Sequence, residues 1–506
     1  MNSRSRRMPS RTGGSRLALI LFLLGAVLGL FGACYALRRS KGGGQTSFDG
    51  RRDVDPRDVA LPRGYRIEAL VTGLDLPSAV AFDERGRVHV LEAGYSYGEV
   101  WAKPRLLRIE PDGTRAVVAE GENPPWNGVV FHEGAFFVAE GGHREGGRLL
   151  RISPEGEIRV LIGGLPSLGD HHTNGPAIGP DGWLYFGQGS ATNSGVVGMD
   201  NAELGWLESH REFHDIPARD IRLAGRNFRT EDPLQGGQTL TGAFVPFGTP
   251  TRAGQLIRGE VPCTGAILRV RPEVSEVGGS EVGEIEVVAW GLRNPFGLRF
   301  GPDGRLYATD NGYDERGSRP VFGAGDLLWR IEPGTWYGWP DFHGAKPLTD
   351  GDFYAPPAGE RPRFLLAEHP GVPPAPVAVF GVHSSSDGLD FSTSERFGFV
   401  GDAFVAQFGD MAPGAGKVLE PVGFKVVRVE LDSGAIDEFA VNRSRSYGPA
   451  SRVGGGGLER PLDVKFDPSG EALYVVDFGV LTTSRSGPEP RRGTGVLWRI
   501  TRGERP

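Results

Sequence analysis

Hydrophobic and polar positions follow the same order six times along the chain. A short hydrophobic strand, a polar turn and a second hydrophobic strand ending in glycine recur, as in NPFGLRFGPDGRLYATDNG from residue 294 and RPLDVKFDPSGEALYVVDFG from residue 460. The turns place Asp or Ser beside Gly, which supplies the positive φ angles that a tight hairpin needs. Each unit therefore predicts a β-hairpin.

A third strand follows every hairpin, and a fourth follows most of them. RLLRISP from residue 148 and VLWRIT from residue 496 are third strands, and RFLLAE from residue 363 is the candidate fourth strand of the fourth unit. Repeated sheets of about four strands are typical of β-propellers. We predict an all-β, six-bladed β-propeller over residues 61–506.

The first and last repeats predict how the ring closes. The last repeat ends at VLWRIT with almost no chain left, so it lacks a fourth strand, whereas YRIEALV from residue 65 precedes the first hairpin as a spare strand. An open sheet edge invites misassembly. We expect the spare strand to complete the last blade.

The third repeat is interrupted by residues 191–264, which separate its second and third strands. Structureless loops of more than about 15 residues are uncommon in compact domains unless they are functional. This insertion is expected to fold over one face of the ring. His210 and His214 within it are four residues apart, a spacing that could bind a metal on a helix, but solvated loop residues are the preferred interpretation.

The N-terminal region predicts attachment to a membrane. Residues 17–37 are 21 uncharged, mostly apolar residues, and a helix of this length spans the hydrocarbon core of about 30 Å. Basic residues on both sides favour a cytoplasmic tail at 1–16, a signal anchor, and a periplasmic or cell-surface remainder. A cleaved signal with lipidation at Cys34 is the alternative. Residues 38–60 are polar and glycine-rich, which predicts a flexible linker.

Composition narrows the function classes. The chain has 79 Gly and 39 Pro and a formal net charge of −7, so it lacks the basic footprint of a nucleic-acid-binding protein. The two cysteines are Cys34, in the apolar segment, and Cys263. An intramolecular disulfide between them is implausible.

Polar residues gather in three stretches that are expected at the central channel: DHHTNG, GLRNPFG and TDNGYDERGSRPVFGAGD. A neutral histidine accepts a proton at neutral pH, an arginine holds a carboxylate through two parallel hydrogen bonds, and Gly-rich backbone beside Asp and Asn offers oxygen ligands for Ca²⁺. The candidate residues are Asp170, His171, His172, Arg293, Asn294, Asp310, Asn311, Asp314 and Asp326.

Three motifs carry a resemblance to a known family: GLPSLGDHHTNGPAIGPDGWLYFGQG, GLRNPFGLRFGPDGRLYATDNG and GTWYGWPDFHG. With them, most of residues 61–502 resembles the soluble glucose/sorbosone dehydrogenases, six-bladed propellers that depend on pyrroloquinoline quinone (PQQ). The resemblance implies PQQ and Ca²⁺ as cofactors and a carbohydrate as substrate. It leaves the electron acceptor open.

The resemblance also implies roles for individual residues. His171 falls where the family has its catalytic base, and Asp170 on the acid before it. The carbonyls of Gly312 and Tyr313 fall where the family holds Ca²⁺. The remaining positions would face the cofactor, and they are Arg293, Asn294, Asn311 (Gln in the family), Asp326 and Arg460.

Four positions depart from the family pattern. Ser190 replaces an Asp that supports the base, Gly409 a Lys, Leu462 an Arg, and Trp126 a Gln. Because PQQ carries three carboxylates, losing two cations is expected to weaken its binding. The insertion offers substitutes, namely Arg219, Arg222 and Arg226.

The resemblance therefore implies oxidation of a sugar or polyol, with hydride passing to C5 of PQQ and His171 as general base. Two alternatives stay open. One is a cofactor-free surface propeller that binds a glycan or a protein, in which Arg293 and Asn294 only bridge neighbouring blades. The other is a Ca²⁺-dependent lactone hydrolase, which would need acids such as Asp170, Asp310, Asp314 and Asp326 to converge on one ion.

Overall fold

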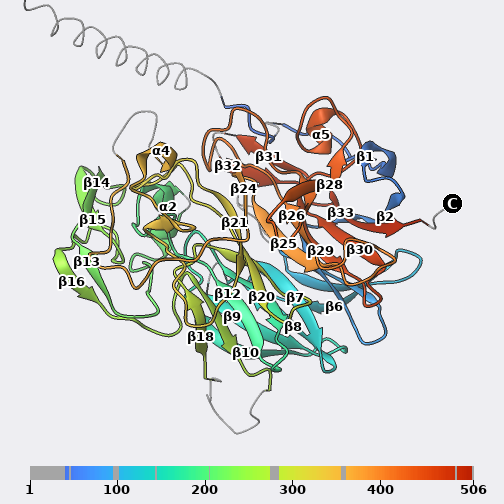
Figure 1. Ribbon diagram of the computed structural model, residues 1–506, viewed down its shortest axis with the longest axis horizontal. Helices are drawn as coiled ribbons and strands as arrows, with labels where there is room; N and C mark the ends of the chain where they lie inside the picture. Colours follow the sequence, from blue (N-terminus) through green and yellow to red (C-terminus); the bar gives the residue numbers. More distant parts are fainter. Residues whose placement is uncertain are drawn as a thin grey trace, which may run out of the picture.

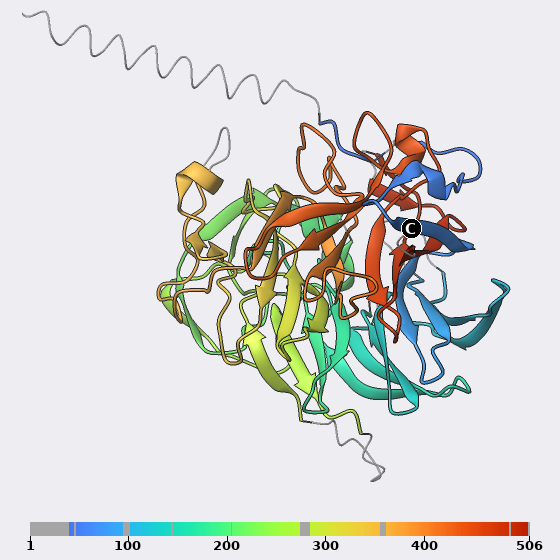
Figure 2. The same cartoon turned by 45° about the vertical axis from the view of Figure 1, so that its right-hand side comes forward.

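The structure is a computed structural model in which six sheets follow one another around a common axis (Figures 1 and 2). This arrangement confirms the predicted all-β, six-bladed propeller. The described residues are 40–44, 47–94, 102–142, 145–203, 205–273, 284–354, 361–484 and 487–503.

Each blade is an antiparallel sheet whose first strand lies nearest the axis. The strands of blades one to three are β3 (Pro77–Phe82), β4 (Val88–Glu92), β5 (Arg105–Ile109), β6 (Arg115–Glu120), β7 (Trp126–His132), β8 (Ala135–Glu140), β9 (Gly147–Ile152), β10 (Ile158–Leu165), β11 (Thr173–Ile178), β12 (Leu184–Gln188), β17 (Ala266–Val270) and β18 (Glu286–Trp290). Those of blades four to six are β19 (Pro295–Phe300), β20 (Leu306–Asp310), β21 (Gly325–Arg330), β24 (Ala378–Val382), β25 (Ser386–Phe391), β26 (Ala403–Gln407), β27 (Lys425–Val429), β28 (Ile436–Asn442), β29 (Pro461–Phe466), β30 (Ala472–Asp477), β33 (Gly495–Arg502) and β2 (Tyr65–Leu74).

The ring closes as the sequence predicts, because β2 is the outer strand of the last blade. It pairs antiparallel with β33 from Tyr65 opposite Arg502 to Leu74 opposite Gly495. The N-terminal part of the propeller therefore holds its C-terminal strand in place.

The fourth blade corrects one strand assignment. Its outer strand is β24, which pairs with β21, and not RFLLAE from residue 363. Leu366 in that stretch instead forms an isolated bridge with Leu223 of the insertion. Leu365 and Leu366 are buried there, so their hydrophobic character serves a contact between loops.

The insertion in blade three is folded. It contains α2 (Met199–Glu203), α3 (Trp206–Ser209) and two hairpins, β13 (Ile221–Ala224) with β16 (Ala253–Ile257) and β14 (Asn227–Glu231) with β15 (Gln238–Gly242). It leaves β12 and rejoins β17 at the edge where the chain enters the inner strands, and in Figure 1 it forms the green part of the molecule.

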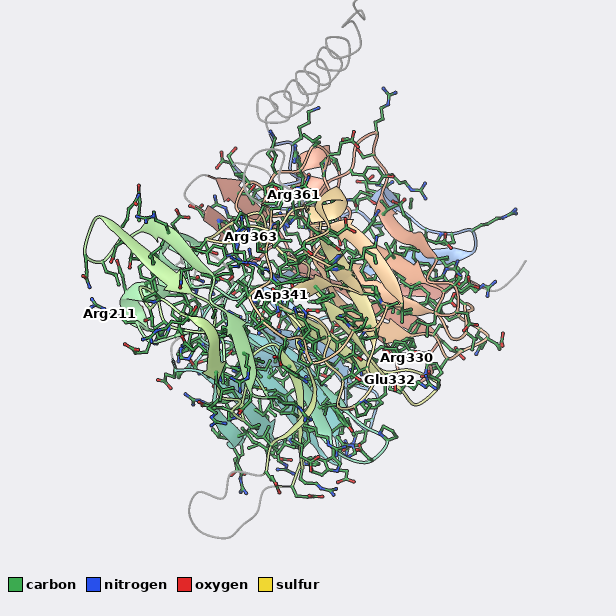
Figure 3. All side chains as sticks on the ribbon, turned by 60° about the vertical axis from the view of Figure 1, so that its left-hand side comes forward. Arg211, Arg330, Glu332, Asp341, Arg361 and Arg363 are labelled. Atoms are coloured by element: carbon green, nitrogen blue, oxygen red, sulfur yellow. The ribbon has the colours of Figure 1, made fainter. Side chains whose placement is uncertain are left out.

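The base of the insertion is tied to the blade-four loop, because Arg319 of that loop donates to the Ser194 carbonyl at 3.1 Å and the Ser194 hydroxyl donates to the Arg319 carbonyl at 2.6 Å. Asp215 accepts hydrogen bonds from the Ala191 amide at 2.7 Å and from the Thr264 hydroxyl at 3.1 Å, which brings both ends of the insertion together. Asp341 pairs with Arg319 at 3.0 Å, and Arg319 also donates to the carbonyl of Arg363. Asp341 and Arg363 are labelled in Figure 3, and Arg211 of the insertion lies apart from them at the periphery.

Two acids at the ends of second strands fasten the turns that lead into their own blades. Asp310 accepts from the amides of Arg293 (3.1 Å) and Asn294 (2.6 Å) and from the Trp329 indole (3.2 Å). Asp477 does the same for Arg460 and Trp498 in blade six. We call this arrangement the acid clasp; it places the Arg-Asn turn by backbone contacts.

The N-terminal region is described only from residue 40. The predicted anchor at 17–37 lies outside the described residues, and within the described part of the chain no helix is long and apolar enough to cross a membrane. The predicted linker is partly fixed: Val59 of β1 (Val59–Ala60) pairs with Asn442 of β28, and buried Arg52 donates to Asp477 at 2.5 Å. Residues 52–60 thus belong to the surface of blades five and six.

Candidate active site

His171 stands in the turn leading into β11, and its tautomer follows from its partners. Its Nδ1 lies 2.9 Å from the carbonyl oxygen of Ser190 and 3.1 Å from that residue's Oγ. A carbonyl only accepts, so Nδ1 carries the proton and donates it. The Ser190 hydroxyl itself donates to the Thr192 carbonyl at 2.7 Å. The lone pair of the neutral ring is therefore on Nε2.

The surroundings of His171 keep the imidazole neutral. Burial lowers the pKa of His171 well below its usual value, and the positive charges of Arg293 and Arg316 lower it further. The side chain is 6% exposed, and no hydrogen bond to Nε2 is found within the part of the chain that the structure describes. A neutral ring with an unprotonated, unpartnered nitrogen is what a general base requires.

Arg293 is held by the insertion and by Asp314. Its Nε donates to the carbonyl of Asn193 at 3.0 Å and its Nη2 to the Asn193 side chain and to Asp314, both at 2.9 Å. Nη1 lies 3.3 Å from the Asn311 carbonyl. Most of the guanidinium donors are thus engaged within the protein, which leaves little of the fork for a ligand carboxylate. Asn193 was not singled out from the sequence.

Asp314 is the anionic centre of this region. Burial alone would raise the pKa of Asp314, but Arg293, Arg316 and His383 outweigh it and hold the pKa well below its usual range. The carboxylate lies 2.9 Å from both arginines and 3.7 Å from Nδ1 of His383. Burial would lower the pKa of His383, yet Asp314 and Glu315 raise it to about 9. Asp314 therefore stays charged and paired.

Arg316 joins the site to the insertion. It donates to Asp170 at 2.8 Å and to Asp200 of α2 at 2.7 Å, and it pairs with Asp314. Asp170 also accepts from Asn201 of α2 at 3.1 Å. The acid beside His171 thus anchors α2 beside the site. Arg316 was missed because the sequence shows only a charged loop and not its partners.

A chain of amides crosses three blades. Asn174 donates to Asn294 at 2.9 Å, Asn294 donates to Asn311 at 2.7 Å, and Asn311 donates to Asp387 at 3.2 Å. These contacts agree with the interpretation of the Arg-Asn turn as a bridge between blades. They also fix Asn294 and Asn311 close to Arg293 and His171.

Asp326 braces the turn at Gly312. Its carboxylate accepts from the Gly312 amide at 2.8 Å and from the Ser384 hydroxyl and Ser386 amide at 2.7 Å. A side chain at Gly312 would meet the carbonyl oxygens of residues 324 and 325 at 2.4 and 2.5 Å, so the close approach requires glycine. The ring of Tyr313 is buried, and its hydroxyl donates to the Phe342 carbonyl at 2.8 Å.

The side of the site formed by blades five and six differs from the family pattern. Arg460 is fully buried, donates to the carbonyls of residues 408–410 at 3.1–3.3 Å, and stacks on Phe408 and Phe424. Gly409 packs so closely that a side chain would meet Phe424 at 2.5 Å. Leu462 packs in an apolar cluster with Leu76, Phe408, Met411, Phe478 and Leu481.

The remaining predicted positions serve packing or face solvent. The indole of Trp126 is fully buried and donates to Glu140 at 3.0 Å. Burial lowers the pKa of His172 to about 4, and its Nδ1 lies 3.3 Å from the Ser167 carbonyl. The three insertion arginines proposed to replace lost cations are exposed instead, because they lie on outer strands and turns: Arg219, Arg222 and Arg226.

The residues present fit one end of the expected cofactor. Nε2 of His171 and the remaining Nη1 donor of Arg293 are available to a quinone, whereas Asn311 already donates to the Ser386 carbonyl and to Asp387, both at 3.2 Å. Among the described residues, no group of three His, Cys, Asp or Glu side chains could hold a metal, so Ca²⁺ at this place would depend on main-chain carbonyls such as those of Gly312 and Tyr313. Toward blades five and six, buried Arg460 is the cation expected from the family pattern, and it lies beside an apolar cluster.

Comparisons with known proteins agree with this architecture. Residues 253–412 match the family model described as Glucose / Sorbosone dehydrogenase, which confirms the resemblance of the sequence to that family. The match includes Arg293, Asn294 and Asp326 and ends before Arg460. A comparison with curated protein sequences gave no significant match.

Solved structures of similar fold cover most of the chain. The holo PQQ domain of pyranose dehydrogenase from Coprinopsis cinerea is 15% identical, with 92% of this chain and 100% of that chain covered and a TM-score of 0.51. The calcium structure of the family AA12 carbohydrate-active enzyme from Trichoderma reesei is 16% identical over 90% and 99%, with a TM-score of 0.51. At these identities the likeness shows the shared propeller fold.

Proposed function

Starting from the family match and the tautomer of His171, we propose that this chain is a PQQ- and calcium-dependent oxidoreductase that oxidises a sugar or related polyol. The single observation that carries the proposal is the imidazole of His171, whose Nδ1 is fixed on the Ser190 carbonyl at 2.9 Å and whose Nε2 has no partner among the described residues. The substrate class follows from the family, and an extracytoplasmic, membrane-anchored location remains part of the proposal.

In the proposed reaction, Nε2 of His171 accepts the proton of the substrate hydroxyl. The Ser190 carbonyl holds the ring and stabilises the imidazolium that forms. The positive charges of Arg293 and Arg316 keep the ring neutral before the substrate arrives. Asp170 acts through Arg316, with which it forms an ion pair at 2.8 Å, as a positioning residue for the loop around the base.

The proposed cofactors supply the redox chemistry. When bound, PQQ would take the hydride from the substrate carbon while Ca²⁺ polarises the quinone. Asn294 and the remaining Arg293 donor would hold the quinone, and Asn311 would position Asn294. The carbonyls of Gly312 and Tyr313 would hold Ca²⁺, and Asp326 would brace their turn. Arg460 would offer its positive charge to a carboxylate of the cofactor from blade six.

Reconstitution tests the proposal. The full chain is incubated with PQQ and Ca²⁺, desalted, and assayed with aldoses and polyols and a redox dye. We expect retained quinone absorbance and dye reduction that needs both cofactors. Loss of all quinone absorbance on desalting, together with no dye reduction by any sugar or polyol, would reject the proposal.

A second candidate function is supported by the engaged arginines. Arg293 pairs with Asp314, Arg460 is stacked between two aromatic rings, and Leu462 lies in an apolar cluster. These contacts suit a cofactor-free propeller that binds a glycan or protein. Binding of an oligosaccharide with no retained quinone would support it.

The lactone hydrolase has less support, because all four candidate acids are engaged. Asp170 and Asp314 pair with Arg316, Asp310 forms an acid clasp, and Asp326 braces Gly312. Lactone hydrolysis by the protein that a chelator abolishes would support the lactone hydrolase function.

A further inference from the structure

The first described residues, 40–44, dock on the edge of the ring that carries His171. The Gly43 amide donates to both carboxylate oxygens of Asp410, at 3.0 and 2.9 Å, and the Lys41 amide donates to the Val418 carbonyl at 2.8 Å. Asp410 lies in the loop from β26 to β27, on the edge of the ring at which the inner strands begin. Figures 1 and 2 show this start of the chain, in blue, beside β31 (Leu481–Ser484) and β32 (Gly487–Pro490).

The three consecutive glycines are required by the closeness of this contact. A Cβ at Gly42 would meet Ala412 Cβ at 2.6 Å, one at Gly43 would meet the Phe424 ring at 2.1 Å, and one at Gly44 would meet Thr483 Oγ1 at 2.2 Å. The backbone therefore fits a specific groove. The direction in which the chain leaves the ring is fixed at residue 41.

Exposed arginines lie on the same edge of the ring as this docked segment. Residues 439–458, which join β28 to the turn before β29, contain three arginines and no acid. Arg443, Arg445 and Arg452 are exposed and form no ion pair within the described part of the chain, and Arg452 lies 3.4 Å from the Gly44 carbonyl. We call the set Lys41, Arg443, Arg445, Tyr447 and Arg452 the basic rim.

Three of the acids next to the basic rim are already engaged. Asp55 pairs with Arg57 at 2.7 Å, Glu438 pairs with Lys425 at 2.7 Å, and Asp58 accepts from the Gly456 amide at 2.7 Å. Tyr447 is 52% exposed, with the Lys425 amine 5.3 Å from its ring. An exposed tyrosine among cations suits the interface between lipid headgroups and water.

The chain before the rim sets its distance from the apolar segment. Leu37 ends the 21 uncharged residues, and only residues 38–40 separate it from docked Lys41. An extended chain covers at most about 3.6 Å per residue, so Lys41 of the rim lies within about 14 Å of Leu37. Arg38 and Arg39 add two more positive charges within this interval.

We propose that residues 17–37 anchor the chain in a bilayer and that the basic rim rests on its anionic phospholipid headgroups. Each exposed Lys or Arg near such a surface adds attraction, which falls off within a Debye length of about 8–10 Å. The edge of the ring that carries His171 then faces the membrane. This proposal rests on the anchor and on the rim, and it is independent of the proposed redox function.

Energy transfer to labelled lipid tests the orientation. The full chain with Cys34→Ser is reconstituted in lipid nanodiscs that carry an acceptor on the headgroups, and a donor is attached at Tyr447→Cys. Cys263 is buried and stays unlabelled. The control donor is at Arg85→Cys, which lies in the turn between β3 and β4 on the opposite edge of the ring. With about one third anionic lipid, we expect several-fold stronger transfer at position 447 than at position 85.

Charge reversal separates headgroup binding from simple tethering. Arg443→Glu with Arg445→Glu should reduce transfer at position 447 severalfold, whereas the matched pair Arg63→Glu with Arg85→Glu on the opposite edge should not. Zwitterionic lipid alone should also reduce it. Equal energy transfer from donors at positions 447 and 85 would overturn the proposal. The basic rim would then be a candidate binding surface for an acidic protein. Strong energy transfer at position 447 that changes neither with the charge-reversal variants nor with the lipid composition would also overturn the proposal.

Discussion

At the scale of single residues, Ser190 stands where the resembling family has an acid, and this difference changes how the base is held. In the resembling family an Asp supports the base, whereas here the main-chain carbonyl of Ser190 accepts the Nδ1 proton at 2.9 Å. A carbonyl fixes the tautomer without adding a negative charge. The positive charges of Arg293 and Arg316 then lower the pKa of His171 and disfavour the imidazolium, while Asp314 opposes them.

The low pKa of His171 has a consequence for the pH profile. A base whose pKa lies well below 6.5 stays unprotonated as the pH falls through neutrality. We expect kcat/KM for sugar oxidation by the reconstituted protein to stay level between about pH 8 and pH 6.5 and to fall only in more acidic solution. An acidic limb centred at or above pH 6.5 would contradict the assigned environment.

A substitution at Leu462 tests the side of the proposed cofactor site at which the family's second arginine is missing. Leu462→Arg restores a cation where the family has one, beside Arg460. One additional charged hydrogen bond contributes about 1.5–3 kcal/mol, so PQQ should bind about ten- to a hundredfold more tightly. Equilibrium binding followed by quinone absorbance measures this change. Leu240→Arg in the exposed insertion hairpin is the control, and equal effects of the two variants would refute the assignment.

Residues in repeated motifs were predictable and residues in irregular loops were not. His171 and Arg293 follow from motifs that stand at fixed places in the repeat. Asn193 and Arg316 contact residues far away in the sequence, such as Arg293 at 2.9 Å and Asp170 at 2.8 Å. No local sequence pattern predicts such pairs, because the insertion and the blade-four loop are far apart in the sequence and come into contact only in the folded protein.

At the scale of elements, the acid clasps of blades four and six link the end of the second strand to the turn that leads into the same blade. Burial raises the pKa of Asp310 to about 6, and the hydrogen bonds from Asn294, Trp329 and Arg293 oppose that rise. The sequence suggested Asp310 as a channel acid. The structure shows that its oxygens are used by the backbone of its own blade.

Removal of the clasp should destabilise blade four. Asp310→Ala leaves two amides and an indole without their acceptor, and each buried orphan costs about 1–3 kcal/mol. We expect the free energy of unfolding in urea to fall by at least about 3 kcal/mol. Asp432→Ala, at an exposed turn, serves as the control. Similar losses of unfolding free energy in the two variants would show that the acid clasp does not stabilise blade four.

Strands were predicted well because their alternation of inner and outer positions is local. The fourth outer strand was missed because Leu365 and Leu366 form a hydrophobic run that packs on Leu223 of the insertion. The true outer strand, Ala378–Val382, is short and follows a proline-rich stretch. Hydrophobicity alone does not distinguish a strand from a buried loop contact.

At the scale of the whole molecule, the ring depends on β2 and β33, which come from opposite ends of the propeller. Tyr65 stands opposite Arg502, so the closing pair joins residues more than 400 positions apart. Closure keeps the six inner strands in register around the site.

Breaking the closing strand should therefore cost more than breaking another outer strand. Ile67→Pro removes a donor from β2, opposite Ile500, and opens the ring. Ile436→Pro makes the same change in β28 of blade five and leaves closure intact. We expect Ile67→Pro to lower the melting temperature at least twice as far as Ile436→Pro in calorimetry. Equal losses would mean that closure gives no extra stability.

The most direct measurement follows the quinone absorbance of the PQQ- and Ca²⁺-loaded protein after anaerobic mixing with a sugar substrate. We predict rapid reduction in the wild type and in His132→Asn, a control on the opposite edge of the ring. His171→Asn should retain the quinone yet reduce it about 10²- to 10⁴-fold more slowly. Reduction in His171→Asn at the wild-type rate would contradict the role of His171 as the base.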